Sequence, residues 1–317
     1  MHRDPALFDL ANADPETLAI NQQLERLTLA IPSPIEHGVE QLRRARADGR
    51  GLFGPLVTGE MGEDRSIPGP AGDLGIRVFV GDRVDGIYLY YHGGGWVMGS
   101  AAGSDERLEN IARNAGVAVV SVEYRLAPEH PYPLPADDSE AAALWLVDNA
   151  KAEFGTDRIV IGGPSAGAHL AATTVLRMRD RHAFAGFAGA VYVYGFFDLG
   201  LTPSARDYGS RPLVLNTPLC EWFADAYVGG ADVSDPDVSP LRADLAGHPP
   251  ALIVIGTLDP LLDDSLVLAD RLIEAGVETD VLVSTGSAHG FTSATVPASD
   301  RANATIQEWI RTRVTTI

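Results

Sequence analysis

A serine between two glycines is the feature of this sequence best suited to chemistry. Ser165 stands in the run Gly-Pro-Ser-Ala-Gly at 163–167, directly after the apolar segment 158–161. A serine at this spacing, where a strand ends and a helix begins, lies on a tight turn that exposes its hydroxyl, and the flanking glycines leave room for that turn. The pattern predicts a nucleophile elbow, in which the Ser165 hydroxyl attacks a carbonyl carbon.

An acid and a histidine follow this serine in the chain. Asp259 comes just after the apolar run 251–256, and His289 lies between the last predicted strand and the final helix. The order Ser, Asp, His is that of α/β-type serine hydrolases and differs from the orders of the chymotrypsin and subtilisin folds. Asp263 and Asp264 are rival acids, but they open a predicted helix, where carboxylates usually cap it or interact with its dipole. We therefore expect Ser165, Asp259 and His289 to act as nucleophile, orienting acid and general base.

A glycine run precedes the serine. Gly93, Gly94 and Gly95 come straight off a predicted strand, so their backbone N–H groups are not screened by side chains. We expect Gly94, Gly95 and the N–H of Ala166 to form an oxyanion hole, each donor stabilising the transition state by about 3 kcal/mol. Gly93 is either a further donor or a residue that permits the turn. A phosphate-binding loop is disfavoured, because the run has neither the GxxxxGK[ST] pattern nor the glycine spacing of a dinucleotide-binding fingerprint.

The remaining histidines and the cysteine receive structural interpretations. His92 is expected to brace the glycine run by hydrogen bonds, and His169 to make packing or polar contacts. Cys220 is the one cysteine of the chain and is interpreted as a packing residue. The acids and histidines show no paired helical spacing for a metal, so we expect neither a metal nor a cofactor.

The elements that must position these residues alternate between strand and helix. Apolar runs predict strands at 75–80, 86–91, 117–124, 158–161, 189–197, 251–256 and 278–283. Capping residues and periodicity predict helices at 105–115, 136–149, 166–181, 263–275 and 299–314. This alternation favours an α/β fold, a mostly parallel sheet covered by helices on both faces, which we interpret as a single domain over residues 1–317.

Two segments do not fit the alternation. Residues 1 to about 50 are helix-rich, and 200–248 form an insertion rich in Pro and Asp. We expect both to form a helical cap above the sheet. Trp96, next to the glycines, and Trp222, in the insertion, are expected to line a substrate pocket, although ordinary core packing is as good an interpretation for the aromatics of the insertion.

Composition narrows the partners. The chain has 317 residues, 45% of them apolar, and a formal net charge of −19. Such a charge disfavours binding to nucleic acid or to anionic membranes and favours neutral substrates. No apolar run approaches the roughly 20 residues of a membrane span, and the N-terminus lacks a secretory pattern, so a cytoplasmic location is expected. A homodimer is a further expectation.

Taken together, the motifs resemble those of the hormone-sensitive-lipase-like esterases. The resemblance runs from about residue 70 to the C-terminus and covers the glycine run, the segments around Ser165, Asp259 and His289, and the segment 123–131, Glu-Tyr-Arg-Leu-Ala-Pro-Glu-His-Pro. It departs from the family at Pro164, where an acidic or small polar residue is usual; a proline lacks the N–H and stiffens the elbow.

The resemblance implies an α/β-hydrolase fold with a helical cap and carboxylesterase activity on short- to medium-chain esters. It also implies that Arg125 and Glu129 pair to brace loops beneath the site. The same acyl-transfer groups would serve an amidase, a lactonase or a deacetylase of a small metabolite, because specificity depends on the cap and pocket walls. A non-catalytic small-molecule receptor is the remaining alternative, disfavoured because His289 is retained.

Overall fold

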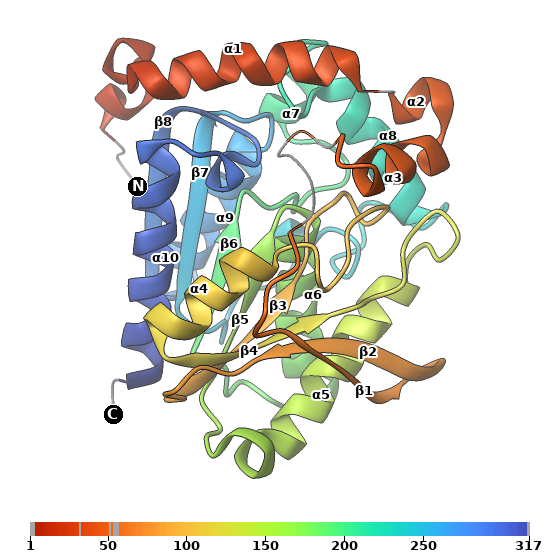
Figure 1. Ribbon diagram of the computed structural model, residues 1–317, viewed down its shortest axis with the longest axis vertical. Helices are drawn as coiled ribbons and strands as arrows, with labels where there is room; N and C mark the ends of the chain where they lie inside the picture. The colour runs from red at the N-terminus through yellow and green to blue at the C-terminus, as the bar shows by residue number, and fades with distance from the viewer. Residues whose placement is uncertain (1–3, 32, 51, 53–56, 316–317) are drawn as a thin grey trace.

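One mixed sheet organises the chain. The computed structural model describes residues 4–31, 33–50, 52 and 57–315, within which eight strands pair in the order β1-β2-β4-β3-β5-β6-β7-β8 (Figure 1). The strands are β1 (Glu63–Gly69), β2 (Gly72–Phe79), β3 (Gly86–Tyr91), β4 (Val117–Val122), β5 (Ile159–Pro164), β6 (Gly189–Val193), β7 (Ala251–Leu258) and β8 (Thr279–Ala288). From β4 to β8 every pairing is parallel, and β1 and β2 run antiparallel at one edge. The predicted α/β fold is confirmed.

Apart from shifts of a few residues at other strand ends, the strand predictions differ from the structure at three places. β1 was not predicted, because its sequence Glu-Asp-Arg-Ser-Ile-Pro-Gly is mostly polar and only Ile67 is buried. β6 ends at Val193 instead of residue 197, because Tyr194 adopts a positive φ of 41°. β8 continues to Ala288, so it carries the chain directly to the next residue, His289.

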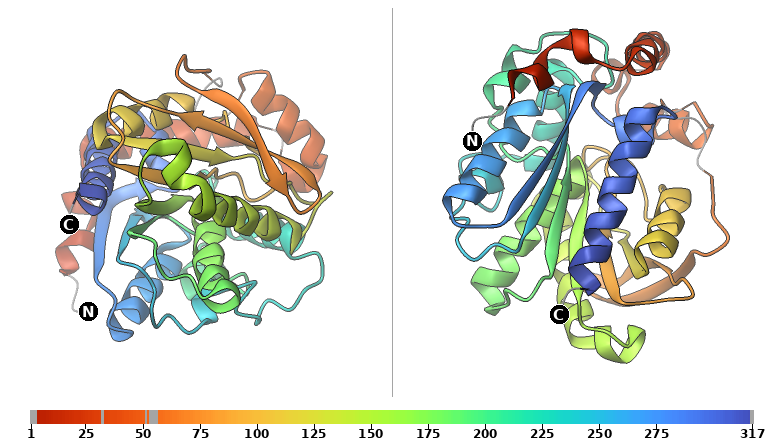
Figure 2. Two further views of the ribbon diagram at one scale, coloured as in Figure 1. Left: turned by 90° about the horizontal axis from the view of Figure 1, so that it is seen from below. Right: turned by 90° about the vertical axis from the view of Figure 1, so that its left-hand side faces the viewer.

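Helices cover both faces of the sheet. α4 (Asp105–Ala115) and α10 (Pro297–Thr315) pack on one face, while α5 (Leu134–Phe154), α6 (Ala166–His182) and α9 (Leu262–Glu274) pack on the other. The right-hand view of Figure 2 shows the sheet between α9 and α10. Side chains alternate along β3, so Ile87 and Leu89 face the α5 and α6 layer while Tyr88 and Tyr90 face α4 and α10. The five predicted helices are confirmed, and α4 has the predicted bounds.

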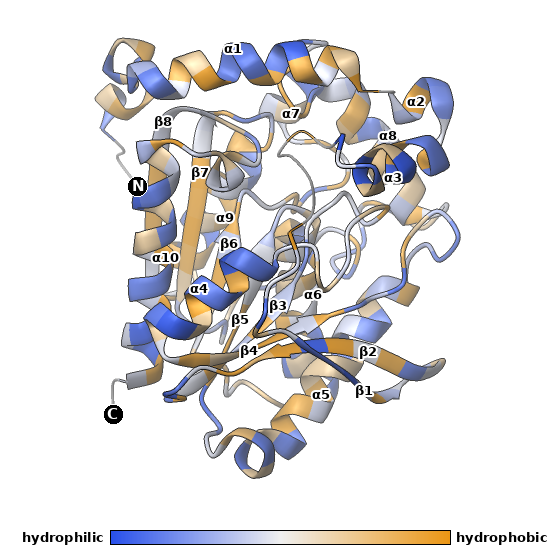
Figure 3. Cartoon of the chain, in the orientation of Figure 1, coloured by the Kyte–Doolittle hydropathy of each residue, from blue (hydrophilic) through white to orange (hydrophobic). Residues whose placement is uncertain are grey.

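Further helices lie beyond the end of the sheet (Figure 1). We call α1 (Pro15–Ala30), α2 (Pro34–His37), α3 (Val39–Ala47), α7 (Pro203–Asp207) and α8 (Thr217–Val228) the cap helices. α1 crosses above β8, where the Asn21 amide donates to the carbonyl of Gly286 at 2.7 Å. Hydropathy colouring shows apolar residues concentrated along the strands and polar ones on the outer helix surfaces (Figure 3).

The second half of the predicted insertion contacts α6. Asp237 accepts two hydrogen bonds from Arg177 of α6, at 2.7 and 2.6 Å, which holds this part of the chain against the body of the protein. Cys220, on α8, is buried in the main core cluster. None of the helices built from the described residues combines the length and the apolar character that a membrane crossing requires.

Candidate active site

Ser165 lies on a strained turn between β5 and α6. Its backbone has φ 55° and ψ −121°, a conformation that non-glycine residues adopt only where the surroundings impose it. The N–H of Ser165 donates to the Val193 carbonyl at 2.8 Å, which fixes the turn to the neighbouring strand. A Cβ added at Gly163 or at Gly167 would overlap the carbonyl oxygen of Tyr91. The two glycines are therefore required by close backbone approach on both sides of the serine.

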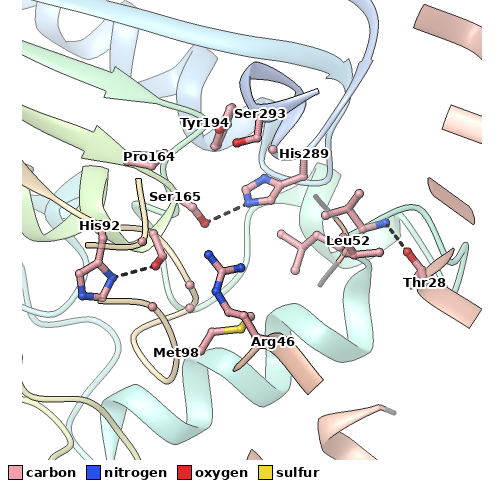
Figure 4. Close-up of a pocket in the computed structure, with 18 of the residues that line it drawn as sticks. Thr28, Arg46, Leu52, His92, Met98, Pro164, Ser165, Tyr194, His289 and Ser293 are labelled. Carbon is pink, nitrogen blue, oxygen red and sulfur yellow. Dashed lines mark hydrogen bonds between the residues drawn. The ribbon is translucent and has the colours of Figure 1, made fainter. Parts of the chain in front are cut away.

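Three side chains from three strand ends meet in one hydrogen-bonded chain. His289 Nε2 lies 3.0 Å from Ser165 Oγ, and His289 Nδ1 lies 2.8 Å from Asp259 Oδ2 (Figure 4 shows the first contact). Asp259 is 2% exposed, and its other oxygen accepts from the Leu261 N–H at 2.9 Å. A carboxylate beside Nδ1 makes that nitrogen the donor, which leaves Nε2 free to accept the serine proton.

The rival carboxylates have other partners. Asp264 is fully buried and accepts from the N–H groups of Phe197 and Asp198 and from the Thr202 hydroxyl. Burial raises the pKa of Asp264 to about 7. Asp263 accepts from the Ser204 N–H at 2.8 Å. Both residues organise the start of α7 and α9, and the structure brings only Asp259 to His289.

The glycine run lines the cavity above Ser165. Gly93, Gly94 and Gly95 all form part of its wall. Their N–H groups have no acceptor among the described residues, and Ala166 begins α6, where amides lack intrahelical partners. Gly94 and Gly95 have φ of 126° and 59°, which only glycine adopts readily. The run thus offers unpaired donors beside the nucleophile, the property an oxyanion hole needs.

His92 braces this run, as predicted. Its Nδ1 lies 2.9 Å from the Gly93 carbonyl, its ring stacks on Tyr124 at 4.1 Å between centroids, and the Tyr124 hydroxyl donates to its carbonyl at 2.7 Å. Burial lowers the pKa of His92 to about 4, so its imidazole is neutral at neutral pH. A neutral ring can donate from Nδ1 to the Gly93 carbonyl and hold the loop in place.

A cavity of about 1340 Å³ opens above the serine. Trp96 belongs to its wall, as expected, although the ring is only 1% exposed and stacks on Tyr227 at 4.6 Å. Its indole N–H donates to His169 at 3.3 Å, which confirms a polar packing role for His169. The expectation that Trp222 lines the pocket needs correction, because Trp222 is not among the described residues that form this wall. Its ring packs against Phe223, and Phe223 is part of the wall.

The predicted pairing of Arg125 with Glu129 is wrong. Arg125 instead binds Asp138 of α5, with contacts of 2.8 Å to each carboxylate oxygen. Glu129 is bound by Arg43 of α3, which also donates to the carbonyls of Val97 at 2.7 Å and Ala127 at 2.9 Å. The segment does brace the loops, but it also anchors a cap helix to the chain that follows the glycine run.

Several wall residues were not predicted from the sequence. Tyr194 packs its ring on that of His289 at 4.8 Å, and its hydroxyl lies 2.7 Å from the Thr292 hydroxyl. Arg46 of α3 and Met98 also line the cavity (Figure 4). No sequence pattern predicts the positive φ of Tyr194. The sequence predicted that the segment containing Arg46 lies above the sheet, but not which of its side chains face the cavity.

Comparisons with known proteins place the chain among esterases. A family model described as alpha/beta hydrolase fold matches residues 88–293. Esterase LipI of Mycobacterium tuberculosis is 34% identical over 94% of this chain and 95% of its own, and carboxylic ester hydrolase LipN of the same organism is 35% identical over 72% of this chain and 63% of its own. The solved hyperthermophilic esterase of the archaeon Pyrobaculum calidifontis superposes with a TM-score of 0.83 at 31% identity, over 96% of this chain and 99% of that one.

Proposed function

From the membership of this chain in the hormone-sensitive-lipase-like esterase family of the α/β-hydrolase fold, we propose that it hydrolyses carboxylic esters through an acyl-enzyme on Ser165. The observation that carries the proposal is the hydrogen-bonded chain of Ser165, His289 and Asp259, with contacts of 3.0 and 2.8 Å. A serine hydroxyl becomes a competent nucleophile when an adjacent base accepts its proton and a third group orients that base.

The reaction has two displacements. His289 Nε2 takes the Ser165 proton as Oγ attacks the ester carbonyl carbon, and the imidazolium then gives that proton to the departing alkoxide. Water, deprotonated by the same nitrogen, attacks the acyl carbon; the bond to Oγ breaks and Ser165 recovers its proton. Asp259 holds the imidazole in the required tautomer and stabilises its charged form.

The negative oxygen of each tetrahedral intermediate needs donors. The N–H groups of Gly94, Gly95 and Ala166, with Gly93 as a further candidate, are proposed to supply them. Two observations support this: the loop amides have no acceptor among the described residues, and Ala166 lies at the start of α6. Backbone donors on a rigid turn need no reorganisation as the charge develops, which makes them effective in the transition state.

We infer that the preferred esters carry short to medium acyl chains, as the family resemblance implies. The cavity is bordered by apolar side chains, among them Phe196, Leu215, Leu219 and Phe223. Burial of about 0.8 kcal/mol per methylene in such a wall raises affinity for longer chains until the wall is reached. Leu219 and Phe223 of α8 belong to this wall, so the position of this cap helix contributes to the length limit.

Hydrolysis of p-nitrophenyl esters from acetate to decanoate tests the proposal. We expect turnover with an optimum at short or medium length, and loss of at least about 10³-fold in kcat for Ser165→Ala, because no other group can form the acyl-enzyme. Thermal unfolding of the variant supplies the control for folding. Turnover that survives in a folded Ser165→Ala protein would refute the role of Ser165, and a folded wild type inactive on every ester would refute the esterase proposal.

A further inference from the structure

Arg46 of the cap helices is a partly buried cation with no acidic partner among the described residues. Arg46 lies on α3, where its neighbours in sequence form ion pairs. Those pairs are Arg43 with Glu129 at 2.8 Å, Arg44 with Glu40 at 3.9 Å and Arg50 with Asp48 at 2.9 Å. Among the described residues, no side chain forms an ion pair or a hydrogen bond with the Arg46 guanidinium, and its Nε is buried without an acceptor.

This unpaired cation lies in the wall of the cavity that holds the nucleophile. Figure 4 shows the Arg46 side chain extending from α3 into the cavity, on the side of Ser165 and His289. Burial lowers the pKa of Arg46, and its charge contributes to the lowered pKa of His92, which begins the glycine run. The guanidinium is therefore partly desolvated and acts electrostatically on the floor of the site.

Among the described residues of the cavity wall, no acidic side chain is shown to pair with this charge. Asp105, which also lines it, is held by Arg77 at 2.7 Å. The other acidic side chains of the wall, Glu36, Glu106 and Asp300, are exposed to solvent. A desolvated charge is costly unless it is paired, so the missing partner is expected to arrive with the ligand.

We propose that Arg46 binds a carboxylate of the substrate, so that the preferred esters of this enzyme carry a free carboxylate in addition to the ester bond. The planar guanidinium presents parallel N–H donors that match the two oxygens of a carboxylate. This rests on the proposed esterase function and names its substrate class. It departs from the expectation of neutral substrates: the overall negative charge acts at long range and is screened by salt, whereas the partly buried guanidinium acts within the cavity.

Two matched substrate pairs test the assignment. Monoethyl adipate and ethyl hexanoate differ only in a carboxylate in place of a methyl group on the acyl side, and 5-acetoxypentanoate and pentyl acetate differ in the same way on the alcohol side. The readout is the ratio of kcat/KM for the charged ester to that for its neutral match, followed by acid release at constant pH. Effects of a variant on folding or on general reactivity cancel in this ratio.

We expect Arg46→Gln to lower the ratio for at least one pair by roughly 10- to 100-fold, the usual range for loss of a hydrogen bond to a charged group. Arg46→Lys, which keeps the charge without the fork, should retain part of the preference. The matched control is Arg44→Gln on the same helix, whose ion pair is exposed, and it should leave both ratios within twofold of wild type. Ratios for both pairs that are unchanged in Arg46→Gln would overturn the proposal.

A binding measurement separates this inference from the esterase proposal. Titration calorimetry with adipate dianion requires no turnover, and we expect binding to wild type that weakens by a similar factor in Arg46→Gln. Equal binding by the two proteins, or no binding to wild type, would overturn the role of Arg46 even if neutral esters are hydrolysed. Binding that depends on Arg46 in a protein inactive on every ester would uphold the carboxylate site and refute the esterase proposal.

Discussion

At the scale of single residues, the site depends on the orientation of one imidazole. The Leu261 N–H holds one oxygen of Asp259 while the other faces His289 Nδ1, so the carboxylate has one available position. Tyr194 packs against the imidazole ring and limits its rotation. The proton on Nδ1 is thereby fixed, and Nε2 is kept as the acceptor toward Ser165.

Asp259→Asn tests this orientation. An amide can donate to Nδ1, which favours the tautomer with the proton on Nε2, so we expect kcat to fall by about 10³- to 10⁴-fold. The matched control is Asp263→Asn, four residues further along, whose carboxylate caps a loop at Ser204 and should change kcat by less than threefold. Ester hydrolysis under saturating substrate measures both. Similar losses in the two variants would mean that Asp259 is not special to the chemistry.

At the scale of elements, the sequence predicted the sheet and helices that carry the site but not the walls around it. Apolar runs identified the interior strands, and turn residues placed Ser165, Asp259 and His289 at strand ends. The edge strand β1 was not predicted, because a strand that faces solvent has no apolar run. The ion-pair partners of Arg125 and Glu129 were not predicted either. Nothing in the sequence distinguishes Asp138 and Arg43 from the other charged residues as partners, since the pairing depends on the folded arrangement.

Arg43→Gln tests how α3 is anchored. The change removes donors to the Val97 and Ala127 carbonyls as well as the ion pair with Glu129, so we expect a loss of about 1–2 kcal/mol in the free energy of unfolding and a higher KM. Urea unfolding and ester kinetics give the two readouts.

The control for this anchor is Glu129→Gln. Its carboxylate is half exposed, and exposed ion pairs contribute little, so the loss should stay below about 0.5 kcal/mol. Equal losses in the two variants would show that the ion pair, and not the pair of backbone carbonyls, holds α3.

At the scale of the whole molecule, buried titratable groups set the response to pH. Burial lowers the pKa of His92, His169 and His248 to about 4 in each case. Each histidine gains a proton near pH 6.5 once the chain unfolds, so between about pH 4 and 6.5 the unfolded chain binds three protons that the folded chain does not. Asp264 has the opposite effect, because its raised pKa lets the folded chain hold one extra proton between about pH 4 and pH 7.

The three protons taken up by the unfolded chain exceed the one held by the folded chain, so the free energy of unfolding should rise with pH between about pH 4 and 6.5. We expect the free energy of unfolding at pH 7 to exceed that at pH 5 by roughly 2–4 kcal/mol, measured by urea unfolding. His248→Gln removes one of the three titrating imidazoles and should flatten the slope. Among the described residues, His248 is not part of the cavity wall, and its Nε2 contacts the Tyr192 hydroxyl. Equal stability at the two pH values would contradict the balance.

Because Cys220 is buried, its reaction with a thiol reagent can report local opening of α8. This is the one thiol of the sequence, it is buried on α8, and burial raises its pKa well above the usual range. A disulfide reagent attacks the thiolate, so modification in native buffer requires α8 to detach first. The rate at which Cys220 is labelled therefore measures how often α8 detaches from the cavity above Ser165, and no engineered cysteine is needed.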